Sequence, residues 1–274
     1  MINKHNIAIF LGVLLMMAAV SFFSTVGTDS VVKGQFAINN IDNAVGEAIK
    51  DQGNGYADGE CIAEGHIILD IEDKGEWVKV YTISSVGWFG FENGVFTKIS
   101  GSGAIPTVIT FSINKDGEYS LHEYKVPMDG AGYLESIKKM FPRKLHNSVL
   151  NAQDYYADLA KQQEAQATEY LKVIGRTAKV SADHVEKQLA NINVEASNKL
   201  FAEFTKYDSL LNNCPYWLGT KEMVENGVRY IYETAQRKSE DGYDIITFKK
   251  SKEDGTVVEE RCYKIVGNEI QLIK

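Results

Sequence analysis

The chain has 274 residues, of which 44% are hydrophobic and 24% are charged, a balance typical of a folded globular protein rather than a disordered one. Its formal net charge of −8 argues against nucleic-acid binding, because neutralising phosphates requires clustered lysine and arginine. With 4 prolines and 23 glycines, the composition also excludes collagen-like and proline-rich architectures.

The most specific signal is an uncharged apolar run at residues 7–23. At about 1.5 Å per residue, a helix of this length extends roughly 26 Å, at the short end of what crosses a membrane. Lys4 precedes the run and Asp29 follows it, which predicts a cytoplasmic N-terminus and an extracytoplasmic remainder. We interpret residues 1–33 as a single-pass anchor in the cell membrane. The alternative is the cleaved signal peptide of a secreted protein, although residues 24–27 lack the A-x-A pattern of a cleavage site.

Residues 34–146 are predicted to form an α+β domain in which a helix lies on a curved antiparallel sheet. Apolar residues recur at helical spacing over residues 36–51. Short runs rich in Val, Ile, Tyr, Phe and Trp follow, and turn pairs separate them, which is typical of antiparallel hairpins. The expected strands are residues 66–72, 77–84, 87–92, 95–100, 107–113 and 119–126, with turns at Lys74-Gly75, Asn93-Gly94 and Asp116-Gly117.

A helical connector at residues 147–204 and a small β-meander domain at residues 205–274 complete the predicted α+β organisation. Helical patterns cover residues 132–140, 147–174 and 183–204, with a break at Gly175. The hairpin pattern then returns, with strands expected at residues 228–234, 243–249, 257–265 and 269–273.

Three cysteines are too few for a disulfide-built scaffold, so the core must hold the fold together. If a bridge forms, the best pair is Cys214 with Cys262, because both lie in the C-terminal region. The alternative is three buried or free thiols.

Catalytic signatures are missing from the sequence. It contains no H-E-x-x-H, G-x-S-x-G or phosphate-binding glycine loop, and no K-T-G follows its S-x-x-K matches. We therefore expect no cofactor, and the sequence favours a non-catalytic role without deciding it. The alternative is a metal-assisted hydrolase in which Glu64, His66 and His122 hold a metal ion, because Glu64 and His66 share one strand face.

Two aromatic clusters are candidates for a ligand groove, since aromatic walls bury much area with few polar groups. Ordinary core packing is the competing interpretation for both. The clusters comprise Trp88, Phe89 and Phe91, and Tyr216 with Trp217.

Several short segments resemble text in the extracytoplasmic regions that follow the peptidase domain in some Firmicute relatives of the β-lactamase regulatory sensor-transducers, which are membrane zinc metallopeptidase receptors. The peptidase domain itself has no counterpart here, so no catalytic residue is carried over. The resemblance implies a free-standing sensor-side module in bacterial membrane signalling, with a membrane receptor or peptidase as candidate partner. The segments are residues 41–45, 64–69, 90–94, 138–145, 193–199 and 217–233.

Overall fold

The computed structural model describes residues 29–57 and 59–274. The chain divides into two units, Met1–Asn39 and Asn40–Lys274, and the fold discussed below lies in the second. The apolar run at residues 7–23 lies outside the described residues. Within the described ranges, no helix combines the length and the apolarity that a membrane crossing needs.

The predicted α+β class is confirmed by a large antiparallel sheet accompanied by several helices. Its first strands are β1 (Cys61–Asp73), β2 (Trp77–Glu92), β3 (Val95–Gly101), β4 (Ile105–Ile113) and β5 (Tyr119–Lys125). Along one edge, β2 pairs with β1 over nearly its whole length. Its other edge is shared, because β4 pairs with the first half of β2 and β3 with the second half. β5 then extends the sheet beyond β4.

The single long strand β2 differs from the two strands expected at residues 77–84 and 87–92. That expectation was wrong because Ser84 and Ser85, at the junction of the two expected strands, do not form a turn. Both are buried and bonded: Ser84 Oγ lies 2.8 Å from Thr107 Oγ1, and Ser85 Oγ donates to Ser102 O at 3.0 Å. The turn expected at Asn93-Gly94 is confirmed, since both residues have positive φ, of 50° and 74°.

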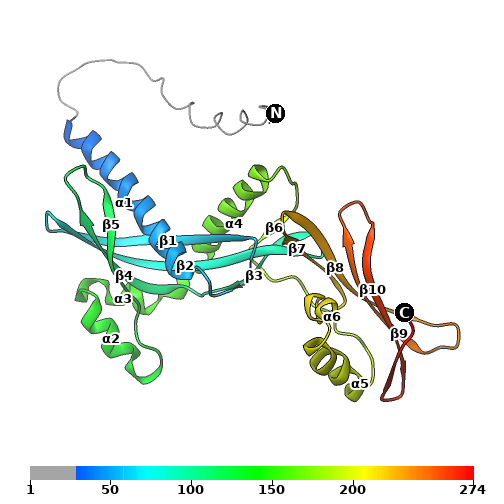
Figure 1. Ribbon diagram of the computed structural model, residues 1–274. Coiled ribbons are helices and arrows are strands. Elements are labelled where there is room, and N and C mark those ends of the chain that lie inside the picture. Colours follow the sequence, from blue (N-terminus) through cyan, green and yellow to red (C-terminus); the bar gives the residue numbers. More distant parts are fainter. Residues whose placement is uncertain (1–28, 58) are drawn as a thin grey trace, which may run out of the picture. The chain divides into compact units, whose positions relative to one another are not determined.

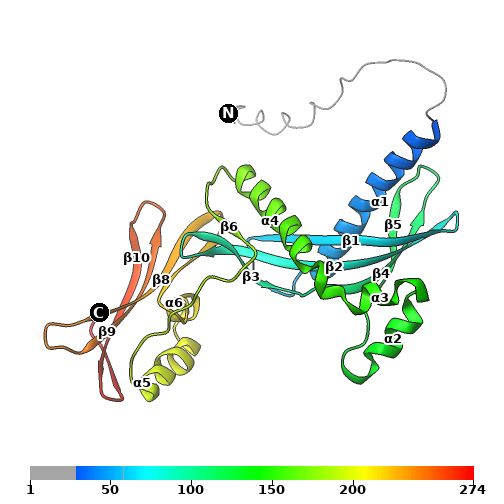
Figure 2. The same ribbon diagram turned by 180° about the vertical axis from the view of Figure 1, so that it is seen from behind.

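Helices cover both faces of these strands (Figures 1 and 2). α1 spans Asp29–Gly53, and its part from Asn40 onward packs on one face, where Ile41 and Val45 contact the apolar residues of β2 and β4. α4 (Tyr156–Val173) packs on the opposite face through Leu159 and Leu171. α2 (Tyr133–Met140) and α3 (His146–Leu150) contribute to the same second layer. A 3-10 turn at Ala152–Tyr155 separates α3 from α4, which divides the helix expected at residues 147–174.

The later strands form a meander: β7 (Gly219–Glu225), β8 (Val228–Lys238), β9 (Asp244–Lys252), β10 (Val257–Val266) and β11 (Glu269–Leu272). The pair Glu92↔Lys221 joins β7 to β2, so the described residues form one 11-stranded sheet. α5 (Val194–Asn198) and α6 (Ser209–Asn213) share a core with the meander that includes Tyr232 and Phe248. Strand β7 was not among the expected elements.

The helix expected at residues 183–204 begins later than predicted. β6 (Val180–Ser181) pairs with β3, and the following chain is extended, with Leu218 N donating to Gln188 O at 2.7 Å. The helix begins after Asn193, whose side chain accepts hydrogen bonds from the backbone N–H groups of Glu195 and Ala196. This N-cap competes with continuation of the helix toward the N-terminus, although the apolar spacing extends further back.

Candidate functional site

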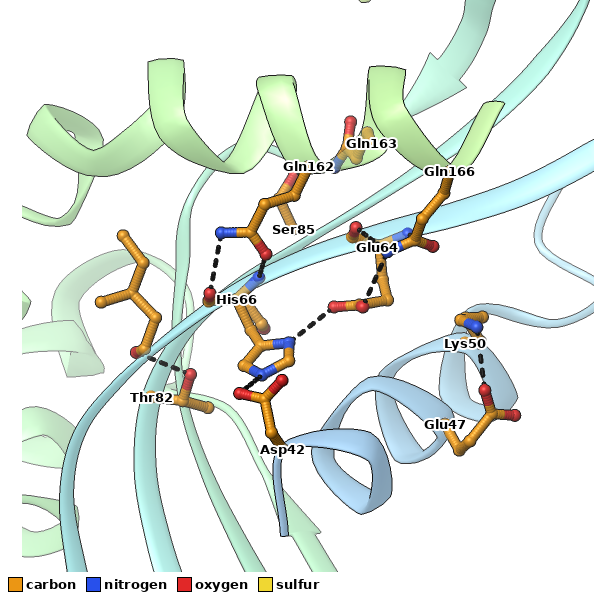
Figure 3. Close-up of polar contacts among 12 residues, drawn as sticks. Asp42, Glu47, Lys50, Glu64, His66, Thr82, Ser85, Gln162, Gln163 and Gln166 are labelled. Carbon is orange, nitrogen blue, oxygen red and sulfur yellow. Dashed lines mark hydrogen bonds and ion pairs between the residues drawn. The ribbon is translucent and has the colours of Figure 1, made fainter. Parts of the chain in front are cut away.

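A buried polar cluster centred on His66 joins α1, β1 and α4 (Figure 3). Side chains alternate along β1, so Glu64 and His66 both face α1 while their neighbours face α4. His66 Nδ1 lies 2.9 Å from Glu64 Oε2, and His66 Nε2 lies 3.1 Å from Asp42 Oδ1 on α1. Burial lowers the pKa of His66, but the hydrogen bonds and negative charges of Glu64 and Asp42 outweigh it and raise that pKa above its ordinary value. The two carboxylates therefore stabilise the charged form of the ring more than water does in an unfolded chain.

Two glutamines of α4 complete the cluster by covering the free edge of β1 (Figure 3). Gln166 accepts from Glu64 N at 3.2 Å and donates to Glu64 O at 2.9 Å. Gln162 makes the same pair of bonds with His66, at 3.1 Å and 3.0 Å. Four helical residues advance about 6 Å and two strand residues about 6.6 Å, so side chains four residues apart on a helix match backbone groups two apart on a strand. The helix thus substitutes for a neighbouring strand.

This geometry brings together two of the three residues predicted to hold a metal ion. His122 lies elsewhere, with its ring 4.3 Å from the ring of Trp77 in an edge-on contact. Both nitrogens of His66 already lie within hydrogen-bond distance of carboxylates, which a metal ion would have to displace or share. Across the part of the chain that the structure describes, no group of three or more His, Cys, Asp or Glu side chains could hold a metal ion.

A groove of about 390 Å³ lies between α2 and the sheet strands β2, β4 and β5. Its apolar lining comes from Val108, Val126, Met128 and Met140. Its charged lining comes from Lys79 on β2, Glu123 and Lys125 on β5, and Lys139 on α2, with Ser136 also on α2. Because these elements are far apart in the sequence, no local motif marks the groove.

Three lysines and one glutamate leave the groove with a net positive charge in an acidic protein. Lys125 Nζ lies 2.7 Å from Glu123 Oε1, and this hydrogen bond lowers the pKa of Glu123. Within the described residues, neither Lys79 nor Lys139 has a carboxylate partner within ion-pair distance. Lys79 nevertheless acts on Glu123, since its charge contributes to the lowered pKa of that carboxyl, so the three lysines share one glutamate in this partly apolar hollow.

A second hollow, also of about 390 Å³, lies between the end of α4 and the β7–β8 hairpin, with Glu60 just before β1 in its lining. Arg229 contacts Glu60 at 2.5 Å and Glu222 at 3.1 Å, and Arg176 contacts the same Glu222 at 2.5 Å. The two guanidinium groups lie over the ring of Phe91, at 4.2 Å for Arg176 and 5.2 Å for Arg229. The hydrogen bond and charge of Glu60 raise the pKa of Arg229. Since each arginine is paired with a carboxylate, we interpret this network as a structural joint between the two groups of strands.

The aromatic residues predicted to line a ligand groove are mostly core residues. Trp88, Phe89, Phe91 and Trp217 are buried, and only Tyr216 is exposed, at 58%. Apart from Phe91, which supports the paired arginines, they contribute to packing between elements.

The predicted disulfide partners, Cys214 and Cys262, are free thiols in the structure, as is Cys61. Burial raises the pKa of Cys214 to about 12 and that of Cys61 to about 11. Cys214 Sγ makes a weak contact with Lys249 O, and Cys262 Sγ lies 3.5 Å from Thr247 Oγ1. Thiols in such surroundings are poor nucleophiles.

Sequence reasoning missed a buried lysine, Lys98 on β3, which is 3% exposed. Its ammonium group donates to Tyr156 OH at 2.5 Å and to Gln163 Oε1 at 3.3 Å, both on α4. Gly87 and Gly101 make room for its stem, since a Cβ at either position would lie within 3.1 Å of Lys98 Cδ. In the sequence, only Gly87 on β2 and Gly101 at the end of β3 indicate that the interior has room for a lysine side chain.

Comparison with known proteins adds no assignment: no family model, curated protein or solved structure matches the chain.

Proposed function

We propose that this chain is a non-catalytic binding protein, held on the outer side of a bacterial cell membrane by its N-terminal segment, that serves membrane signalling as a sensing or accessory component. The groove between α2 and the sheet carries the proposal, because it combines apolar side chains with three lysines that outnumber its one glutamate. Binding sites generally have this character, a mostly apolar hollow with a few convergent polar groups.

Two sequence observations support the location and the role. The apolar run at residues 7–23, flanked by Lys4 and Asp29, has the pattern of a single-pass anchor with an extracytoplasmic remainder. The resemblance to regions that follow the peptidase domain of membrane sensor-transducers favours a membrane receptor or peptidase as partner. A secreted form is the alternative location.

Crosslinking of the tagged protein in its own membrane tests this proposal. We expect mass analysis to recover a membrane receptor or peptidase together with a protein whose residues 7–23 are still attached. A protein recovered alone, with an N-terminus near Thr28, would contradict both the anchoring and the partner and would favour a secreted protein.

The metal-assisted hydrolase remains testable by zinc titration of the full chain. The engagement of both His66 nitrogens by carboxylates leads us to expect no zinc binding at micromolar affinity. Zinc binding that disappears in a His66→Gln variant would reopen the hydrolase interpretation.

A further inference from the structure

We propose that the groove between α2 and the sheet binds a single amphipathic molecule that has a phosphate monoester head and a short apolar chain. This inference rests on the proposed binding function and specifies its ligand. Three lysines and one glutamate give the groove two positive charges in excess, contributed from three separate elements. A phosphate monoester carries about −1.5 to −2 charges near pH 7, so it can balance this excess, whereas a carboxylate or a sulfate ester leaves part of it uncompensated.

The lysines that line the groove come from three separate elements. Lys79 comes from β2, Lys125 from β5 and Lys139 from α2, so the ammonium groups approach from both walls of the groove. Glu123 is paired with Lys125 and is also acted on by the charge of Lys79, whereas Lys139 has no ion-pair partner among the described residues. The phosphate is therefore placed on the α2 side of the groove, next to Lys139, with Lys79 as its second contact.

The apolar chain of the ligand has its own surface. Val108 is 5% exposed at the base of the groove, while Val126 and Met128 are 48% and 67% exposed beside it. Ser136 Oγ accepts from Met128 N at 3.1 Å and donates to Tyr133 O at 2.7 Å, which holds this segment against α2. Methionine adapts its shape to different apolar partners, so an exposed Met128 suits a flexible chain.

The hollow favours one small molecule over a flat membrane surface. Its volume of about 390 Å³ lies near the lower end of the roughly 300–1,000 Å³ found for small-ligand pockets. The other hollow of similar volume offers no such site, because Arg176 and Arg229 are already paired with Glu60 and Glu222.

The test uses the full chain in nanodiscs of neutral lipid and measures binding of hexyl phosphate by calorimetry. We expect one site, with affinity at least fivefold higher than for hexyl sulfate, hexanoate or inorganic phosphate. Lowering the pH from 7.5 to 5.5 should weaken binding of hexyl phosphate, because its head loses a charge near pH 6, and should leave binding of hexyl sulfate nearly unchanged. Any change in the charge of the protein, including that of Glu123 or the nearby His122, acts on both probes, so the difference between them isolates the charge lost by the phosphate head.

Substitutions locate the site. Lys79→Gln and Lys139→Gln should each weaken hexyl phosphate binding about tenfold, since each removes a charge-assisted contact. Lys138→Gln is the matched control, because Lys138 is the exposed neighbour on α2 and does not line the groove. All three variants should keep the thermal unfolding midpoint of the parent chain, which separates lost binding from lost folding.

Three results would overturn the inference. The first is equal affinity for hexyl phosphate and hexyl sulfate. The second is an equal loss of affinity for hexyl phosphate in Lys138→Gln and Lys139→Gln. The third is binding to phosphatidate-containing vesicles without binding of hexyl phosphate, which would indicate a membrane-surface role. If hexyl phosphate fails but the crosslinking experiment still recovers a membrane partner, the binding function stands and only the ligand is wrong. Failure of both experiments removes the function as well.

Discussion

Strands β1–β5 carry helices on both faces, whereas the β7–β11 meander shares its main core with the short helices α5 and α6. The difference is also chemical. Among the described residues, the buried polar side chains of the first region include Glu64, His66, Lys98 and Gln163, while strands β7–β11 bury only Thr234 and Ser251. A sheet enclosed on both sides must satisfy buried polar groups from within the protein, and here α4 supplies the partners.

The comparison suggests that the close packing of α4 on β1 is the most sensitive feature of the first region. A Cβ at Gly65 would lie 2.4 Å from the backbone oxygen of Leu159, so Gly65→Ala forces the helix and strand apart. We expect a loss of about 3 kcal/mol in the free energy of unfolding, measured by urea denaturation. Gly90→Ala on β2 is the control, because its nearest neighbour atom, in the side chain of Ile99, would lie 3.4 Å away. Equal costs at the two positions would show that α4 does not pack tightly on β1.

The glutamine contacts of α4 should have a smaller, local effect. Gln166→Leu removes the partners of Glu64 N and Glu64 O, and we expect it to destabilise the protein by about 1–2 kcal/mol. Amide hydrogen exchange should accelerate at Glu64 but not at His66, whose backbone stays bonded to Gln162. The control is Ala165→Leu, which places the same new side chain at the adjacent, exposed position of α4. Unchanged exchange at Glu64 in Gln166→Leu would contradict a role for α4 in covering this edge.

The contribution of His66 should depend on pH, because its pKa is raised in the folded protein by Glu64 and Asp42. The stabilisation is fully present below the pKa of an unfolded histidine, near 6.5, and is lost as pH rises through the higher folded value. Denaturation at a series of pH values should therefore show stability falling above pH 6.5. His66→Gln should flatten this decline, while His122→Gln, outside the cluster, should preserve it. A decline that survives in His66→Gln would assign the pH dependence to another group.

These sites show where sequence reasoning succeeds and where it fails. The proximity of Glu64 and His66 was predicted because residues two apart share a strand face, and the Asn93-Gly94 turn because its positive φ is a local requirement. Asp42 and Gln162 escaped prediction because nothing local in the sequence pairs them with His66. The continuity of β2 through Ser84 and Ser85 escaped for the same reason, since their hydroxyl partners come from distant segments.

A substitution in the meander should have the smallest effect on the free energy of unfolding. Lys238 on β8 contacts Asp244 at 3.0 Å, but the lysine side chain is 66% exposed and Asp244 also accepts a hydrogen bond from Gln236. Water can replace the ammonium group, so Lys238→Gln should change the free energy of unfolding by no more than about 0.5 kcal/mol. Raising the salt concentration should abolish even this difference, since exposed charge pairs are screened. A loss as large as that of Gln166→Leu would mean that an exposed polar contact stabilises the meander as strongly as a buried one stabilises the enclosed sheet. Burial would then not explain the difference between the two regions.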